Sequence, residues 1–154
     1  MKDDEKLLKV LQFLALDSGG KLACLPKFPI GEELEIFRTN YRSDNPLFCI
    51  GYECFDCIER NKLGPDEASQ ILADMEALLD EMIGHEKGWW IWSVEEPGLA
   101  RSTHFFWRIL RRLAIEVLNQ RNLPDDVPTI ELTNFITVGR WVPTRKNEKR
   151  TARK

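Results

Sequence analysis

Three of the four cysteines stand at a spacing that is found in metal sites. Cys49, Cys54 and Cys57 follow the pattern C-x4-C-x2-C, which is the spacing of three ligands in plant-type two-iron ferredoxins. The residues between them are bulky or acidic, unlike those of a cluster-binding loop, and the fourth thiol, Cys24, lies upstream of the three. We therefore interpret the cysteines as reduced thiols in the core, with no metal or cofactor. A zinc or iron–sulfur site and a redox pair are the alternatives.

Sequence signatures of catalysis are weak. His85 and His104 are the only histidines, and His85-Glu86 does not continue into the H-E-x-x-H pattern of zinc proteases. The run Ser18-Gly19-Gly20-Lys21 is superficially similar to a phosphate-binding loop, but it lacks the spacing of that motif and is read as a helix stop. The chain has neither a nucleophile elbow nor a dinucleotide-binding fingerprint. We therefore lean against an enzyme, although catalytic groups often come from distant positions.

Arginines gather on and near one predicted helix. Arg108 and Arg112 are neighbours at i, i+4, and Arg111 lies beside them. The simpler interpretation is that these arginines form ion pairs with acidic residues of the same chain. The functional alternative is a docking face for a phosphate backbone or an acidic protein. The candidate contact residues on this helix and in the C-terminal segment are Arg101, Arg108, Arg111, Arg112, Arg145, Lys146, Lys149, Arg150, Arg153 and Lys154.

The net charge of −3 conceals a strong asymmetry along the 154 residues. Residues 1–100 carry 10 Lys and Arg against 20 Asp and Glu, whereas residues 140–154 carry seven against one. Residues 143–154 also contain no large apolar side chain and so build no core. We therefore predict a single globular domain over 1–142 and a flexible basic tail over 143–154. Such a tail is typical of contact with a polyanion or an acidic partner.

Tryptophan is abundant for a chain of this length. Trp89, Trp90 and Trp92 fall within one short aromatic run. Tryptophan is enriched at binding hot spots and also stacks on nucleic-acid bases. These three are the candidate aromatic anchors for a partner. The simpler interpretation is that most of the five tryptophans fill the core.

Hydrophobic periodicity favours a helix-dominated α+β fold. Apolar spacing and start and stop signals indicate four main helices, and the fold is expected to have four or five. A small element of two or three strands completes it, and an all-α fold is the alternative. The aromatic run that favours the second strand is also compatible with one helical turn. We expect Lys6 and Lys9 to face outward from the first helix. The predicted helices are 4–16, 46–61, 65–83 and 102–120, and the predicted strands are 32–40, 88–95 and 129–139. The clearest core stripe is Ile71, Leu72, Met75, Leu78, Leu79 and Met82.

Three classes of function remain open. The first is a non-enzymatic interaction module, such as an inhibitor, immunity protein or regulatory subunit that docks on another protein. The second is a nucleic-acid-binding accessory protein that contacts RNA or DNA through the arginine-rich helix and the basic tail. The third is a metal or redox protein that uses the cysteine cluster. The charged start and the absence of a stretch of ~18 apolar residues predict a cytoplasmic protein with no membrane contact.

Overall fold

The computed structural model is built from helices. It describes residues 2–25, 35, 45–84, 89–92 and 105–131, apart from the side chains of 89 and 90. Short elements are α2 (Ser18–Cys24) and the 3-10 helix η1 (Trp89–Trp92). The long helices are α1 (Asp3–Leu14), α4 (Pro46–Asn61), α5 (Glu67–Gly84) and α6 (Phe105–Gln120).

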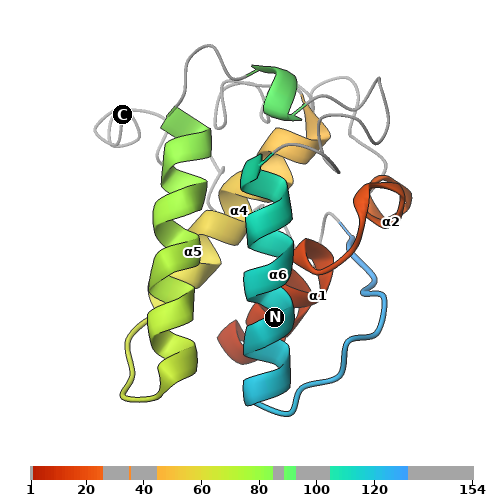
Figure 1. The fold of residues 1–154 in the computed structure, drawn as a ribbon. Helices are drawn as coiled ribbons and strands as arrows, with labels where there is room; N and C mark the ends of the chain where they lie inside the picture. The colour runs from red at the N-terminus through yellow and green to blue at the C-terminus, as the bar shows by residue number, and fades with distance from the viewer. Residues whose placement is uncertain (1, 26–34, 36–44, 85–88, 93–104, 132–154) are drawn as a thin grey trace.

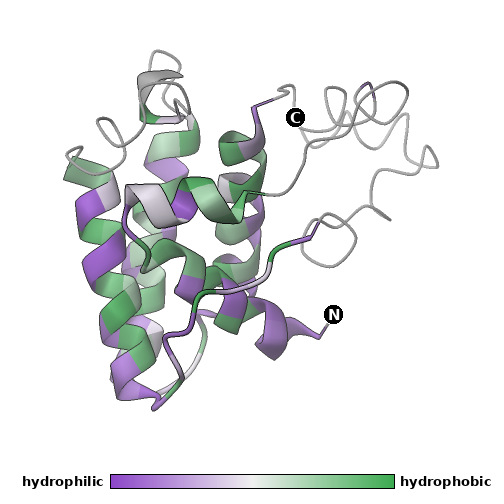
Figure 2. Cartoon of the chain, turned by 90° about the vertical axis from the view of Figure 1, so that its right-hand side faces the viewer, coloured by the Kyte–Doolittle hydropathy of each residue, from purple (hydrophilic) through white to green (hydrophobic). Residues whose placement is uncertain are grey.

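The four long helices close a ring around one core. α4 packs on α5, α5 on α6, α6 on α1, and α1 on α4. α5 and α6 stand side by side, and α4 crosses behind them (Figure 1). Apolar and polar residues alternate along each helix (Figure 2), as expected for helices that bury one face. The ring places the first turns of α6 near the junction between α1 and α2.

The segment after α6 lies across α1 and α2. The ammonium of Lys9 donates to the carbonyl of Thr129 at 2.9 Å, and the amide of Gln12 donates to the carbonyl of Pro124 at 2.9 Å. Within this segment, the side chain of Ile130 is buried. These contacts tie the end of the described chain to the first two helices.

Most predicted helices are confirmed, whereas the strand over 88–95 is wrong where it is described. Trp89–Trp92 forms a 3-10 helix, and residues 129–131 form no strand. An aromatic run of four residues satisfies either conformation locally, so tertiary contacts decide between them. The strand over 32–40 is described only at residue 35, and the rest of the third strand, the start of the last helix and the basic tail lie outside the described residues.

The helix starts follow local capping chemistry. The side-chain carbonyl of Asn45 accepts from the backbone N–H of Leu47 at 2.8 Å and of Phe48 at 3.2 Å, and Pro46 occupies the first helical position of α4. Before α5, hydrogen bonds from Arg121 and then Ser69 lower the pKa of Asp66 to about 2. Asp66 therefore links the start of α5 to the end of α6.

Burial corrects two predictions about which side chains face the core. In the predicted stripe on α5, Leu72, Met75, Leu79 and Met82 are buried, but Ile71 and Leu78 are only partly buried. On α1, Lys6 is buried rather than exposed, and its ammonium lies 2.6 Å from the carboxylate of the buried Glu53 on α4. A lysine predicted to be solvated thus joins two helices inside the molecule.

An aromatic cluster joins η1 to α4 and α6. The ring of Trp92 meets Phe48 edge-on at 5.2 Å and Trp107 at 5.4 Å between centroids. The indole N–H of Trp107 donates to the carbonyl of Ile91 at 2.7 Å. Trp92 also lies directly against Gly51 on α4, where the absence of a side chain leaves room for the ring. Gly51 therefore serves packing, at a position where glycine otherwise weakens a helix.

Replacing Gly51 with alanine should destabilise the protein by ~1–3 kcal/mol through overpacking. A Cβ at this position would overlap Cζ3 of Trp92 and lie 2.6 Å from Cη2. Urea unfolding measures the effect. Gly84→Ala is the matched control, because a Cβ there meets nothing within 4 Å, and it should be neutral or slightly stabilising. Equal stability of both variants would show that Trp92 does not pack on Gly51.

Candidate polyanion-binding site on α6

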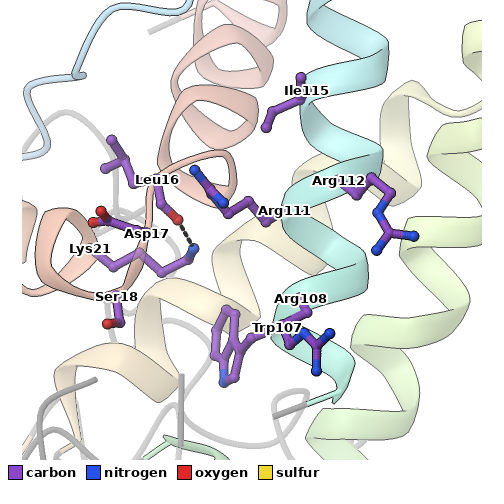
Figure 3. Close-up of a pocket in the computed structure, with 9 residues that line it drawn as sticks. All are labelled: Leu16, Asp17, Ser18, Lys21, Trp107, Arg108, Arg111, Arg112 and Ile115. Carbon is purple, nitrogen blue, oxygen red and sulfur yellow. Dashed lines mark hydrogen bonds between the residues drawn. The ribbon is translucent and has the colours of Figure 1, made fainter. Parts of the chain in front are cut away.

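A cavity of about 300 Å³ lies between α6 and the junction of α1 with α2. Its lining comes from two stretches of the sequence, 16–21 and 107–115, that the ring of helices brings together (Figure 3). Among these lining residues, four side chains are cationic and one is a carboxylate. The lining residues are Leu16, Asp17, Ser18, Lys21, Trp107, Arg108, Arg111, Arg112 and Ile115.

The α1–α2 side of the cavity corrects the predicted helix stop. Asp17 does follow the end of α1, but it then caps α2, because its carboxylate accepts from the backbone N–H of Gly20 at 2.8 Å. An aspartate followed by serine and glycines ends one helix and begins the next equally well. This second helix brings Ser18 and Lys21 to the cavity.

Lys21 is buried at the base of the cavity, with 2% of its surface exposed. Its ammonium donates to the carbonyl of Leu14 at 3.1 Å and to that of Leu16 at 2.5 Å. It also lies 5.9 Å from the ring centroid of Phe13 and 5.4 Å from that of Trp107, within the range of a cation–π attraction. These contacts fix the lysine in place. Sequence reasoning missed this role, because the carbonyls and rings that hold it come from the tertiary fold.

Arg111 closes the cavity on the α6 side. Its Nε donates to the carbonyl of Ala15 at 3.0 Å, which ties α6 to the end of α1. Its side chain reaches from α6 toward the α1–α2 junction (Figure 3). A guanidinium has five N–H donors, and among the described residues the other four have no partner. The side chain is thus positioned by one hydrogen bond and keeps donors for a ligand.

Arg108 and Arg112 differ from other arginines of the described chain. Arg60 pairs with Asp56 and Asp3, and Arg121 pairs with Asp66. Arg108 and Arg112 are exposed, and neither has an ion pair or hydrogen bond with any described residue. The simpler sequence interpretation, in which these arginines pair within the chain, therefore finds no support in the part of the chain that the structure describes.

An apolar edge adjoins the arginines. Phe105 lies one turn before Arg108 and is 58% exposed, and Ile115 is also exposed one turn after Arg111. Residues three and four apart are neighbours on a helix. The outer face of α6 therefore presents cationic and aromatic groups side by side. We call Phe105, Arg108, Arg111 and Arg112 the arginine face.

The other predicted contact residues lie elsewhere. Trp92 is buried in the aromatic cluster, so it is wrong as an exposed anchor, because η1 turns its ring onto Gly51. Of Trp89 and Trp90 only the backbone is described. Arg101 and the basic residues of the tail lie outside the described residues, as do both histidines.

The cysteine cluster forms part of the core. Cys49, Cys54 and Cys57 are buried on α4, and Cys24 is partly buried on α2. Burial raises the pKa of Cys57 to about 11, and burial and then the neighbouring Cys57 raise the pKa of Cys54 well above its usual range. The part of the chain that the structure describes brings together no group of three or more metal-ligating side chains. Cys54 and Cys57 therefore stay protonated at neutral pH, and the buried cysteines pack as apolar groups.

Thiol reactivity should separate Cys24 from the three buried cysteines. A raised pKa leaves little thiolate near pH 8, and burial blocks access. Ellman's reagent at pH 8 should therefore titrate at most one thiol in the native protein and four in denaturant. Cys24→Ser should abolish the native reaction. Rapid reaction of three thiols per chain in the folded protein would instead place the cysteines in an open site.

No protein-family model, curated protein or solved structure matches this chain. Among the described helices, none combines the length and the apolar character that crossing a membrane requires. The side chains of the arginine face and the cavity beside it are therefore the features that point to a function.

Proposed function

We propose that this protein is a nucleic-acid-binding accessory protein that contacts single-stranded RNA or DNA through the arginine face of α6. The observation that carries the proposal is the lack of any carboxylate partner for Arg108 and Arg112 among the described residues. Uncompensated like charges at i, i+4 are destabilising. A bound polyanion supplies the missing counter-charge.

Phosphate suits these side chains by geometry. A guanidinium binds two phosphate oxygens through parallel N–H donors. Arg108, Arg111 and Arg112 lie at i, i+3 and i+4, so successive phosphates of one strand contact successive arginines. The basic tail predicted over 143–154 adds charge to the same partner.

The exposed aromatic ring favours a single strand over a duplex. Phe105 lies beside Arg108 on the outer surface of α6. Aromatic side chains that stack on unpaired bases, together with cations that track the backbone, are typical of single-strand binding. In a duplex the bases are already stacked on one another, and Phe105 gains nothing from them.

An acidic protein surface is the competing partner, and a direct comparison separates the two. Fluorescence anisotropy should give a dissociation constant of ~1–100 µM for a 12-nucleotide single strand at physiological salt, with weaker binding to a duplex. Arg108→Gln with Arg112→Gln should weaken binding about tenfold or more. Phe105→Ala should weaken single-strand binding and leave duplex binding unchanged.

The matched control is Arg60→Gln with Lys62→Gln. It removes the same two charges from side chains that already pair with carboxylates, and it should bind as the wild type does. Tighter binding to poly-L-glutamate than to oligonucleotide of equal charge would replace nucleic acid with an acidic protein as the partner.

A further inference from the structure

The cavity beside the arginine face has the features of a partly enclosed site for one phosphorylated group. It differs from the rest of the face in having walls on two sides, from α2 and from α6. Its volume of about 300 Å³ is at the lower end of small-molecule sites, ~300–1,000 Å³. That volume suits a single phosphorylated unit.

The lining supplies donors and positive charge from independent elements. α2 contributes Ser18 to the lining and the positive charge of Lys21, whose ammonium is held by the carbonyls of Leu14 and Leu16. The donors come from the arginines of α6, which are Arg108, Arg111 and Arg112. The backbone carbonyl of Ala15 already orients Arg111. Preoriented charges in a walled site cost less to order on binding than mobile surface charges.

From this arrangement we infer that the cavity binds a terminal phosphate group, a phosphomonoester. A phosphomonoester carries up to two negative charges near neutral pH, whereas an internal phosphodiester carries one. The surplus of three cations over the single carboxylate of Asp17 favours the more highly charged group. Entry through the α6 rim fits the end of a strand, whereas the middle of a strand would have to fold into the cavity.

Two sources carry this chemistry. One is the 5′-phosphate of a nucleic-acid strand whose following phosphates lie on the arginine face; this form rests on the proposed function. The other is a free phosphorylated metabolite of nucleotide size. The inference concerns the shared phosphomonoester, and the experiment distinguishes its sources.

The experiment compares single-stranded 12-mers with a 5′-phosphate or a 5′-hydroxyl, and separately uses adenosine monophosphate and inorganic phosphate as probes. Wild-type protein should bind the 5′-phosphorylated strand about tenfold more tightly than the 5′-hydroxyl strand. A hydrogen bond to a charged group typically changes affinity by about this factor. Arg111→Gln should remove this preference. Because that variant also loses a bond to α1, a second variant avoids the native contacts.

Ile115→Glu adds a carboxylate at the exposed rim of the cavity, and it should also abolish the preference for the 5′-phosphate. Val127→Glu is its control, since Val127 is 68% exposed and does not line the cavity. It makes the same change in charge and should keep the full preference.

The outcomes separate the inference from the proposed function. Equal binding of both strands would overturn the cavity as a phosphomonoester site while leaving the arginine face as a strand-binding surface. Binding of adenosine monophosphate or phosphate that Ile115→Glu abolishes, without binding of either strand, would support the cavity and overturn the proposed function. Binding of no probe at all would overturn both.

Discussion

Replacing Glu53 with glutamine should lower the free energy of unfolding by about 3–5 kcal/mol, a large share of the stability of a domain of this size. The carboxylate of Glu53 is fully buried and lies 2.6 Å from the ammonium of Lys6. The neutral amide leaves the lysine charge buried without this carboxylate. Desolvation of a charge is costly, and a low local dielectric strengthens the interaction that is lost. Urea unfolding with a constant m-value measures the change.

A double replacement tests whether the loss comes from breaking the buried ion pair. Lys6→Met with Glu53→Leu removes both charges and keeps similar volumes, and it should recover most of the stability. Arg60→Gln is the exposed control. Its ion pairs with Asp56 and Asp3 are solvated, and breaking them should cost at most ~1 kcal/mol. A loss of similar size in Glu53→Gln and Arg60→Gln would contradict a buried ion pair between α1 and α4.

The second large effect distinguishes two adjacent leucines on α5. Leu79 is fully buried, whereas Leu78 is only partly buried at the edge of the core. Leu79→Ala should cost ~2–5 kcal/mol, because it removes methyl groups and leaves a cavity. Leu78→Ala should cost ~1 kcal/mol, since solvent and neighbouring side chains can fill the space.

The same unfolding experiment measures both leucine variants, and each serves as the control for the other. They have the same chemistry and the same helix propensity, so their difference reports burial alone. Equal losses would mean that α5 is rotated about its axis relative to the arrangement described here.

Local sequence signals predicted the helices well. Asn45-Pro46 and Pro65-Asp66 mark the starts of α4 and α5, because capping needs only residues within one turn. The strand that the sequence favours over 88–95 is wrong for the complementary reason. The conformation of this segment depends on Trp92 packing against Gly51, which lies far away in the sequence.

Buried charges were the least predictable feature of the core. Lys6 and Glu53 are 47 residues apart, and the local sequence around either residue does not predict their ion pair. Periodicity assigned lysine to the solvent side because isolated lysine is rarely buried. Only the packing of α1 against α4 shows where its counter-charge lies.

The candidate site was half predictable. Spacing on one helix was enough to group Arg108, Arg111 and Arg112, because residues three and four apart share a face. The cavity beside them has one wall from α2. The sequence at the start of α2 predicts the end of a helix and not the beginning of one. The contribution of Lys21 to that cavity depends on carbonyls at the end of α1. Sequence patterns identify the charged residues, and the tertiary fold determines which of them line the cavity.

Salt dependence of strand binding tests the central claim most directly. Each phosphate contact with a single strand contributes a slope of about −0.7 in log affinity against log salt concentration. Arg108→Gln with Arg112→Gln should therefore flatten the wild-type slope by ~1.4, for two lost contacts. Arg60→Gln with Lys62→Gln should leave it unchanged. A slope that is the same in the wild type and the α6 double variant would contradict binding of phosphates by the arginine face.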